Sequence, residues 1–390
     1  MTGADIFDEL FVLELANNHL GKVERGLKII SAYAQVVRFN NVRAAIKLQI
    51  RDVDNFIHKD FRARTDVRYI KKTVDTQMSI EDYAKLVNAI RQASCISMAT
   101  PFDERSVELC CELGIQILKI ASSDLNDWVL IEKIAKANKP VIVSTGGSSL
   151  KDIDDMVRFF DNRHIPLAIN HCVSLYPSED NELEMNQIDF LRERYPNHVI
   201  GFSTHEYHDW TASMLIAYAK GARTFERHID IDDDGIRVSP YNSLPNQVDE
   251  WFKAYRKAKS MCGAPGTQRR LILPRELEYL DTLLRGVYVK RNLSEGHILT
   301  DNDVYLAIPL QKGQISCREL MRGEVLLRPL QQDEAIMIDD IDSPYASIPS
   351  LKAAIYARGI DRPANSPRPK GVRGEAAEFE YQLGLKKSES

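Results

Sequence analysis

Short runs of apolar, β-branched residues recur along the first part of the chain, and most are followed by a segment with apolar residues at helical spacing. Such runs predict buried strands, and the periodic segments predict helices that cover them. We predict eight strands, at Phe11–Ala16, Ala44–Gln49, Cys95–Ala99, Gln116–Ala121, Val141–Ser144, Leu167–His171, Val199–Ser203 and Thr224–His228. The predicted helices lie at Glu24–Val37, Ile80–Ala93, Glu104–Leu113, Trp128–Ala137, Leu150–Phe160, Asn186–Tyr195, Trp210–Lys220 and Gln247–Met261.

Eight strand–helix repeats of this length predict an α/β protein with a TIM (β/α)8 barrel. The alternative is a doubly wound open sheet. That fold normally has fewer strands and places a glycine-rich phosphate turn after its first strand. Here the first strand runs into Ala16-Asn17-Asn18-His19, which contains no glycine. We therefore expect the barrel.

The pattern changes at Gly263-Ala264-Pro265-Gly266-Thr267. Beyond it, turns separate short strand-like runs, which predict a small β-rich domain. These runs lie at Gly286–Val289, Val304–Ala307, Val325–Arg328 and Ala335–Ile338. From Ser343 the chain is rich in proline, alanine and charge, which predicts a tail with a short helix near Ser350–Ala357. We divide the chain into a barrel at 1–266, a linker at 267–282, a β-rich domain at 283–342 and a tail at 343–390.

Composition narrows the function classes. Of the 390 residues, 44% are hydrophobic and 27% charged, as in an ordinary globular protein, and the net charge of −5 favours neither nucleic-acid nor membrane-surface binding. No apolar window reaches membrane-spanning length, and the first residues lack the pattern of a signal peptide. The six cysteines show no paired spacing, so we expect neither disulfides nor a structural zinc site. A cytoplasmic protein is expected.

Two histidines stand at the carboxyl ends of consecutive predicted strands. His205 follows Val199–Ser203, and His228 ends Thr224–His228. Ligands and catalytic groups collect at this end of the strands in parallel α/β folds. Two neutral imidazoles, with the other positions left to water or substrate, can hold a catalytic divalent metal. The alternative is that each histidine only satisfies loop backbone groups.

Two lysines, Lys47 and Lys119, lie on separate predicted strands among hydroxyl groups. Ammonium groups and short hydroxyls together suit a small phosphorylated anion. Glu14, on the first strand, is a candidate for proton transfer. The alternative is that each lysine forms a buried ion pair with a carboxylate, Glu14 included. The other polar side chains at the strand ends include Gln49, Thr100, Ser122, Asp124, Ser144, Ser174, Tyr176 and Ser203.

Eight motifs occur in a fixed order between residues 13 and 228, and together they resemble the sialic acid synthases, which condense phosphoenolpyruvate with an amino-sugar aldehyde. The motifs are LELANNHLG (13–21), KLQ (47–49), ATPFD (99–103), KIASSD (119–124), STGG (144–147), HCVSLYP (171–177), STHE (203–206) and ERH (226–228). The stretch RGVYVKRNLSEGHILTDNDV (285–304) resembles the antifreeze-like (SAF) domain of the same family.

The resemblance implies a metal-dependent TIM barrel enzyme, a C–C bond-forming transferase of the EC 2.5.1 type. It implies Mn²⁺ or Mg²⁺ on His205 and His228, with Glu14 as the proton-transfer group. Water adds to the intermediate, and phosphate leaves by cleavage of its C–O bond. A domain-swapped homodimer is implied as well. Phosphoenolpyruvate is expected on Lys47, Thr100, Lys119, Ser122, Ser144, Ser174 and Ser203, and the sugar on Gln49, Asp124 and Tyr176.

Departures from the family pattern lie on the sugar side. The family's SGE is replaced by a stretch ending in Ser123-Asp124, and its asparagine before YP by Ser174-Leu175. The family's DHKAS aligns with 239–243, and an arginine of the SAF domain aligns with Ile308, which cannot donate hydrogen bonds from its side chain. We expect an acceptor other than N-acetylmannosamine: another hexose, a diamino-sugar relative or an aldehyde phosphate.

Two other functions remain open at this point. A metal-dependent pyruvate aldolase or lyase needs no phosphate site, so Lys47, Lys119 and the hydroxyls argue against it. A catalytically lapsed carbohydrate-binding protein has no chemical need for Glu14, two lysines and two histidines together. The phosphoenolpyruvate-dependent sugar-acid synthase is therefore our leading hypothesis.

Overall fold

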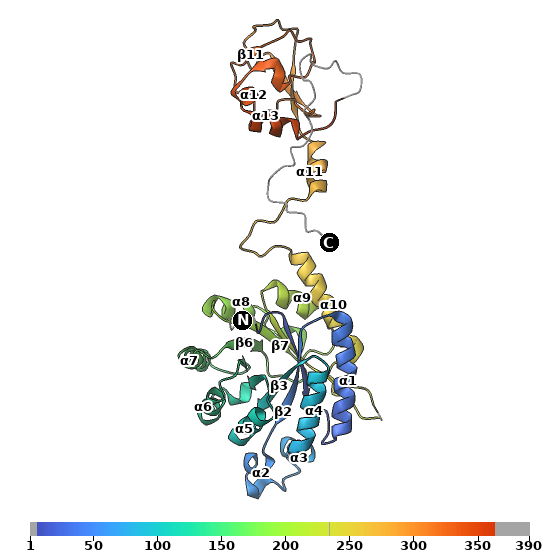
Figure 1. Cartoon of the computed structure of the whole chain (residues 1–390), viewed down its shortest axis with the longest axis vertical. Helices are drawn as coiled ribbons and strands as arrows, with labels where there is room; N and C mark the ends of the chain where they lie inside the picture. Colours follow the sequence, from blue (N-terminus) through green and yellow to red (C-terminus); the bar gives the residue numbers. More distant parts are fainter. Residues whose placement is uncertain (1–5, 234, 363–390) are drawn as a thin grey trace. The chain divides into compact units, whose positions relative to one another are not determined.

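The computed structural model describes residues 6–233 and 235–362 (Figure 1). The chain forms two units, Met1–Pro265 and Gly266–Ser390, each of which is described by itself. In the first unit eight parallel strands close into a barrel, because β1 pairs with β8 as well as with β2. This confirms the predicted TIM barrel and excludes the open sheet. None of the helices described is long and apolar enough to cross a membrane.

The strands follow the predicted order closely. They are β1 (Leu10–Ala16), β2 (Ala44–Ile50), β3 (Ile96–Pro101), β4 (Ile117–Ile120), β5 (Val141–Ser144), β6 (Leu167–Cys172), β7 (Val199–Thr204) and β8 (Thr224–His228). The helices of this unit are α1 (Val23–Asn40), α2 (Val53–Phe56), α3 (Arg68–Asp75), α4 (Ile80–Gln92), α5 (Glu104–Glu112), α6 (Trp128–Lys136), α7 (Leu150–Asp161), α8 (Gln187–Arg194), α9 (Ala212–Ala219) and α10 (Pro245–Cys262).

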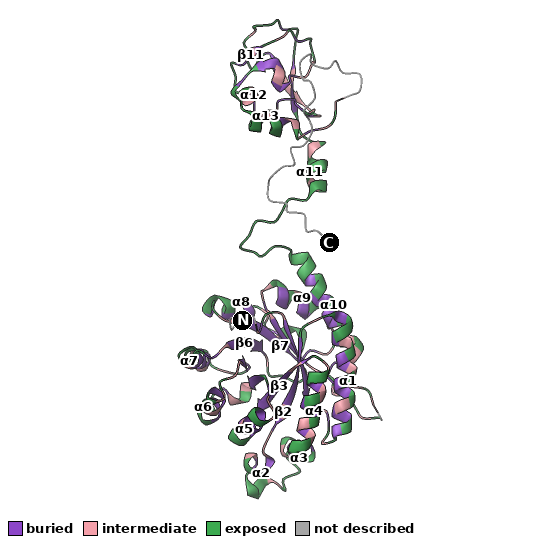
Figure 2. Cartoon of the chain, in the orientation of Figure 1, coloured by how far each residue is buried: buried purple, intermediate pink, exposed green. Residues whose placement is uncertain are grey.

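The main core lies between the strands and the surrounding helices. Outward-facing strand residues such as Phe11 and Leu13 pack there with apolar helix residues such as Ile29 and Trp251. Figure 2 shows the consequence: the strands are buried throughout, whereas the helices are buried on one face and exposed on the other. This division explains why apolar runs predicted the strands and helical periodicity predicted most of the helices.

A second, smaller cluster fills the lumen near the amino ends of the strands. We call it the inner apolar layer; its buried residues are Phe7, Leu10, Val12, Ala45, Met98, Ile117, Ile142 and Ala168. Since side chains alternate along a strand, the residue two positions later also faces the lumen. On each of the six strands that contribute to this layer, the next inward-facing residue beyond it is polar: Glu14, Lys47, Thr100, Lys119, Ser144 and Asn170. The lumen therefore changes from apolar to polar toward the carboxyl ends.

The connection between β2 and α4 contains two helices that the sequence analysis did not predict, α2 and α3. They have four and eight residues. α3 buries only Thr73. Helical periodicity is recognised over windows of about 11–18 residues, so helices of this length are too short to be identified by it.

The second unit is β-rich, as predicted, and has its own core, which includes Val287, Leu326 and Ile336. β9 (Gly286–Val289) pairs antiparallel with β10 (Val304–Ala307), and β11 (Val325–Leu326) with β12 (Ile341–Asp342). Its helices are α11 (Pro274–Asp281), α12 (Pro344–Ser347) and α13 (Pro349–Tyr356).

One predicted strand of this unit, Ala335–Ile338, is replaced by isolated bridges. Its backbone bonds to two separate segments: Ile336 N donates to Val287 O, and Ile338 N to Gly313 O. No continuous ladder can form with partners so divided. Part of the predicted tail, residues 363–390, lies outside the described residues. The finer division into linker, SAF domain and tail stays a prediction.

Candidate active site

The carboxyl ends of the barrel strands surround a cavity of about 660 Å³. Every strand of the barrel contributes at least one lining residue at or just beyond its carboxyl end. Twelve of the thirteen residues predicted for the site line this cavity: Glu14, Lys47, Gln49, Thr100, Lys119, Ser122, Ser144, Ser174, Tyr176, Ser203, His205 and His228. The barrel thus brings together residues that are up to 214 positions apart in the sequence, as from Glu14 to His228.

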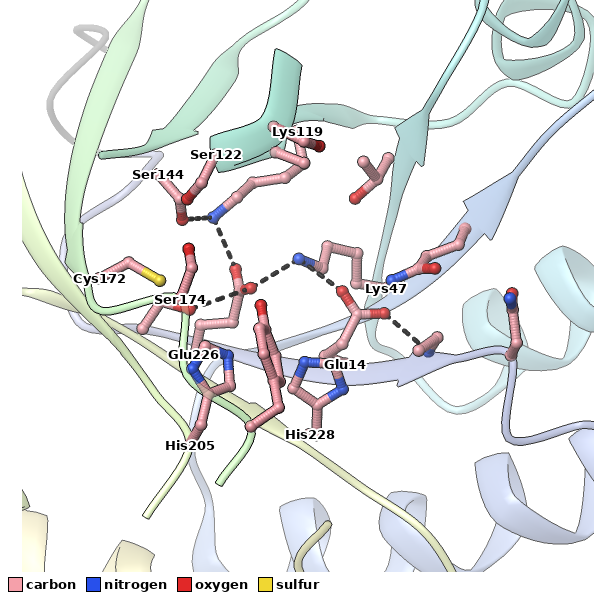
Figure 3. Close-up of a pocket in the computed structure, with 18 of the residues that line it drawn as sticks. Glu14, Lys47, Lys119, Ser122, Ser144, Cys172, Ser174, His205, Glu226 and His228 are labelled. Atoms are coloured by element: carbon pink, nitrogen blue, oxygen red, sulfur yellow. Dashed lines mark hydrogen bonds and ion pairs between the residues drawn. The ribbon is translucent and has the colours of Figure 1, made fainter. Parts of the chain in front are cut away.

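Glu226 is at the centre of the charged groups in the cavity (Figure 3). Its Oε1 lies 2.6 Å from Lys47 Nζ, and its Oε2 lies 3.0 Å from Lys119 Nζ. Ser203 also donates a hydrogen bond to Oε1, at 3.3 Å. One carboxylate therefore holds both lysines. The sequence analysis left open that each lysine forms a buried ion pair with a carboxylate, and the structure contains both of these ion pairs.

Glu14 is the second carboxylate of this network. Lys47 Nζ lies 2.6 Å from Glu14 Oε2, and Ala16 N donates to Oε1 at 2.6 Å. Burial raises the pKa of Glu14, with Lys47 opposing the shift, whereas two lysines together outweigh burial and lower the pKa of Glu226. The two carboxylates are thus unequal: Glu226 stays ionised, and Glu14 is the one that takes up a proton more easily.

The pKa values of the two lysines shift in opposite directions, although both lysines belong to one ion-pair network. Burial lowers the pKa of Lys119, and its single carboxylate partner, Glu226, only partly compensates. Burial also acts on Lys47, but Glu14 and Glu226 together outweigh it and raise its pKa. Lys119 is therefore the less well neutralised cation, and a further anion beside it would be favoured.

Hydroxyl groups surround the amine of Lys119. The amine donates to Ser144 Oγ at 2.6 Å, and the Ser122 hydroxyl accepts from Gly146 N at 3.0 Å. Gly146 permits this convergence: a Cβ there would lie 2.2 Å from Ser174 Oγ and 3.0 Å from Ser122 Oγ. The glycine of the STGG motif thus lets two hydroxyls approach one point of the cavity wall. Such hydroxyls can donate to phosphate or carboxylate oxygens.

His205 and His228 lie side by side, with ring centroids 5.4 Å apart. Burial lowers the pKa of His205 to about 4, and burial together with His205 and Lys47 lowers that of His228 well below its usual range. Both rings are therefore neutral at pH 7. His205 Nδ1 lies 3.1 Å from Val173 O, and because a carbonyl only accepts, Nδ1 carries the proton and Nε2 keeps its lone pair.

The histidine pair fits a divalent metal through its donor chemistry. Neutral imidazoles are typical metal ligands, and a ligating histidine commonly donates its other ring N–H to a backbone carbonyl, as His205 does to Val173 O. Within the described ranges no group of three or more His, Cys, Asp or Glu residues is placed to bind a metal, so the remaining positions would fall to water or substrate. Imidazole nitrogens suit a transition-metal dication better than Mg²⁺, which prefers oxygen ligands.

Asp124 is the predicted site residue that does not line the cavity. It ends a 3-10 turn, Ser122–Asp124, in which successive side chains point about 120° apart. Its Oδ1 accepts from Ser123 Oγ at 2.7 Å, and its buried Oδ2 has no hydrogen-bond partner among the described residues. Burial raises the pKa of Asp124 to about 6. Its assignment to the sugar stays a prediction.

The sequence analysis missed several lining residues. Glu226 belongs to the ERH motif and stands two positions before His228, so strand alternation could have placed it on the same face. Tyr241, whose ring centroid is 5.2 Å from that of His228, comes from the stretch that departs from the family pattern. Arg51, Arg68 and Lys72 come from the connection whose helices were not predicted.

Comparisons with known proteins agree with this geometry. The NeuB family model matches residues 34–266, more than half of the chain. The chain is 28% identical to the spore coat polysaccharide biosynthesis protein SpsE of Bacillus subtilis, over 86% of this chain and 94% of that protein. It is 26% identical to the N-acetylneuraminate-9-phosphate synthase of Drosophila melanogaster, over 86% of this chain and 97% of that enzyme.

A solved structure of a related protein matches this chain in both sequence and fold. The spore coat polysaccharide biosynthesis protein E of Chromobacterium violaceum is 36% identical, with a TM-score of 0.81 over 86% of this chain and 99% of that one. The resemblance to sialic acid synthases is thereby confirmed at the level of the family. With its eight-stranded barrel, its ordered motifs and these relatives, the chain belongs to the NeuB family.

Proposed function

We propose that this protein is a phosphoenolpyruvate-dependent sugar-acid synthase, which condenses phosphoenolpyruvate with an aldose to a 2-keto-3-deoxy sugar acid and releases phosphate. The observation that carries the proposal is the cluster of Lys47, Lys119 and Glu226 deep in the cavity, with hydroxyl groups on one side and two neutral histidines on the other. Membership in the NeuB family, which includes an enzyme named as a synthase of a sialic acid phosphate, supports the same reaction.

Phosphoenolpyruvate brings a phosphate and a carboxylate to this cluster. Lys119 has a single carboxylate partner, which only partly offsets its burial, so an anionic group of phosphoenolpyruvate beside it would be favoured. Lys47 would exchange part of its contact with Glu14 and Glu226 for the second anionic group. Hydroxyl and backbone donors complete the recognition of oxygen atoms that the lysines do not reach. We assign phosphoenolpyruvate to Lys47, Lys119, Thr100, Ser122, Ser144, Ser174 and Ser203.

The reaction balances as follows. Carbon 3 of phosphoenolpyruvate bonds to the aldehyde carbon, whose oxygen takes a proton and becomes a hydroxyl group. Water adds at carbon 2 of the resulting cation and loses a proton. The C2–O bond to phosphate then breaks, phosphate leaves, and the oxygen from water remains as the ketone. Glu14 is positioned beside Lys47 to accept and return a proton in these steps.

His205 and His228 would hold the divalent metal, and such an ion, when bound, supplies Lewis-acid polarisation of the aldehyde and of water. The two rings and Tyr176 form one wall of the cavity, since the Tyr176 ring centroid lies 4.0 Å from that of His205 and 5.9 Å from that of His228. This wall would border the reacting carbons on one side. We place the sugar against Tyr176 and Gln49.

We also propose that the protein works as a homodimer in which the second unit serves the barrel of a partner copy. Support comes from α11, which contains no buried residue and exposes Leu277, Tyr279 and Leu280. Apolar residues exposed on one short helix favour burial against a second copy. Light scattering at micromolar concentration tests this proposal, and a monomer under these conditions would contradict it.

The test of the activity uses phosphoenolpyruvate, Mn²⁺ and a panel of aldoses that includes N-acetylmannosamine. We expect phosphate release that requires an aldose and falls at least about a hundredfold in Lys119→Met. The exposed Lys136, on α6, provides the matched control Lys136→Met, for which the rate should not change. With ¹⁸O in the bridging position of phosphoenolpyruvate, C–O cleavage places the label in phosphate.

Two results would contradict the proposal. Products formed from pyruvate without phosphate release would identify an aldolase instead. Bound phosphoenolpyruvate without turnover of any aldose would identify a binding protein.

A further inference from the structure

Three cations line the outer part of the cavity without belonging to the Lys47–Lys119 network: Arg51, Arg68 and Lys72. Arg51 directly follows β2, while Arg68 and Lys72 are one turn apart on α3 and so share a face of that helix. We call Arg51, Arg68 and Lys72 the outer cations. The function proposed above gives none of them a role.

Arg51 is held in place entirely by uncharged partners. One Nη2 atom donates to Gln49 Oε1 at 3.0 Å and to Tyr69 OH at 2.8 Å. Its guanidinium carbon lies 3.7 Å from the centroid of the Phe102 ring. Its Nε is buried and has no partner within the part of the chain that the structure describes. The side chain is thus pre-positioned and forms no ion pair, although its charge acts on Asp124 and partly opposes the effect of burial, which raises the pKa of that carboxyl group.

Most other cations of the connection between β2 and α4 form ion pairs. Arg62 pairs with Asp54, Arg64 with Asp66 and Lys71 with Asp75. No carboxylate of residues 6–233 or 235–362 lies within ion-pair distance of any outer cation. Lys59 is the exception among the other cations, because it lies outside the cavity lining and forms no ion pair with any described residue. Three of the four other Lys and Arg residues of this connection are thus paired, whereas none of the three that line the cavity is. An unpaired group of this kind is expected where a ligand supplies the anion.

The outer cations also act on one another. Burial lowers the pKa of Lys72, and the positive charges of Arg51 and Arg68 lower it further, against smaller opposite contributions of Glu14 and Asp230. Repulsion among three unpaired cations beside a cavity makes the empty state unfavourable, and an anion between them would relieve it. The inner network, by contrast, contains two lysines and two glutamates and is balanced before substrate binds.

We propose that the acceptor aldose carries an anionic group, phosphate or carboxylate, at the end remote from its aldehyde, and that Arg51, Arg68 and Lys72 bind this group. This inference rests on the proposed function. Lys47 and Arg51 are four residues apart on and just beyond β2, about 13 Å of extended chain. That separation leaves room for a sugar chain between phosphoenolpyruvate at the inner lysines and an anion at the outer cations. Gln49, between them on β2, faces the cavity and can contact the sugar hydroxyls.

The experiment compares matched acceptors and matched variants. Neutral aldoses (mannose, N-acetylmannosamine), their 6-phosphates and the corresponding uronates are assayed for phosphoenolpyruvate-dependent phosphate release; the two charged sets distinguish a phosphate from a carboxylate. We expect one charged set to exceed the neutral set in kcat/KM by about tenfold or more. In Arg68→Ala/Lys72→Ala, KM for that acceptor should rise about tenfold to a hundredfold, with KM for phosphoenolpyruvate changed less than about twofold.

Lys71→Ala is the control, because Lys71 lies on the same helix and pairs with Asp75 outside the cavity. It removes one charge and should leave both KM values unchanged. If KM for phosphoenolpyruvate rises in the double variant and KM for the acceptor does not, the outer cations serve the donor and the inference is wrong. Equal turnover of neutral and charged aldoses also overturns it, while leaving the proposed function intact.

A binding measurement separates failure of this inference from failure of the proposed function. Calorimetry follows the 6-phosphates, the uronates and inorganic phosphate as they bind to the protein loaded with phosphoenolpyruvate. Binding that weakens at least about tenfold in the double variant supports the outer anion site even where no aldose is turned over. If none of these anions binds, or if all bind equally to the wild type and the double variant, the inference is overturned whatever the activity.

Discussion

Lys119 and Glu226 form an ion pair across the barrel, with Lys119 Nζ 3.0 Å from Glu226 Oε2. The pair spans the lumen because β4 and β8 are opposite strands of a closed eight-stranded sheet. The same carboxylate also holds Lys47. The lysines are therefore positioned in the free protein, and phosphoenolpyruvate would exchange part of an existing ion-pair network for new contacts rather than order two mobile side chains.

Glu226→Gln is expected to lower the free energy of unfolding by about 2–4 kcal/mol, because two buried lysines lose their shared carboxylate. Phosphoenolpyruvate should then raise the melting temperature of the variant more than that of the wild type, since its anionic groups replace the lost charge. Glu14→Gln is the matched comparison: it leaves the Lys119 pair intact and should destabilise less. Equal phosphoenolpyruvate-induced shifts in wild type and Glu226→Gln would contradict this account.

Gly201→Ala is expected to prevent stable folding of the barrel. A Cβ at Gly201 would lie 1.8 Å from Thr224 Oγ1 and 2.2 Å from Asn170 Oδ1, two side chains that hydrogen-bond to each other inside the lumen. Overpacking of this degree should cost about 3 kcal/mol or more, measured by denaturant unfolding. Gly266→Ala, where a Cβ meets nothing within 4 Å, is the control. Near-native stability of Gly201→Ala would show that the lumen is less tightly packed than described.

Asp124→Asn is expected to stabilise the protein increasingly as the pH rises from 3.8 to about 6, and fully above that. Burial raises the pKa of Asp124 from an ordinary 3.8 to about 6, so its ionisation opposes folding. This cost is absent below pH 3.8, where the carboxyl group is protonated in both states, develops as the pH rises to 6, and is complete above that. The melting temperature of the variant should exceed that of the wild type by about 2–4 °C at pH 7.5 and match it at pH 3.5. The exposed Asp232 supplies the control variant Asp232→Asn; a gain independent of pH would disprove the explanation.

Mn²⁺ binding, followed by the loss of the free-ion signal in electron paramagnetic resonance, should weaken at least about tenfold in His205→Ala and in His228→Ala. Phosphate release should stop in the presence of EDTA and return with added Mn²⁺. His198→Ala serves as the control: this histidine lines a second cavity and pairs with Asp161. Retention of Mn²⁺ affinity in both site variants would place the metal elsewhere.

The barrel could be predicted from the sequence because strands buried on both sides leave uninterrupted apolar runs, as at Val141–Ser144. Inward-facing polar residues such as Lys47 and Lys119 stood out as single charges within such runs. Glu226 was not predicted as a site residue. It shares a short strand with Arg227 and His228, so it does not stand out as a single charge within an apolar run.

Short helices that bury few residues, such as α2 and α3, could not be predicted from the pattern of apolar residues. α3 has only eight residues, which is too short for helical periodicity to identify it, and the sequence analysis therefore gave no role to Arg68 and Lys72. The ion pairs of Arg62, Arg64 and Lys71 connect residues close in sequence, whereas the unpaired state of the outer cations depends on the fold around them. Asp124 could be assigned to a motif from the sequence, but the position of its carboxylate could not, because that position depends on the 3-10 turn Ser122–Asp124.

The inner apolar layer has a kinetic consequence. Its buried side chains stop the lumen below Lys47 and Lys119, so this end of the cavity is blind and both reactants must arrive from the strands' carboxyl ends. A ligand bound at the inner lysines lies beneath one bound at the outer cations. On the proposed function, phosphoenolpyruvate would thus have to enter first and phosphate leave last, and the order of entry and exit would be fixed by the barrel.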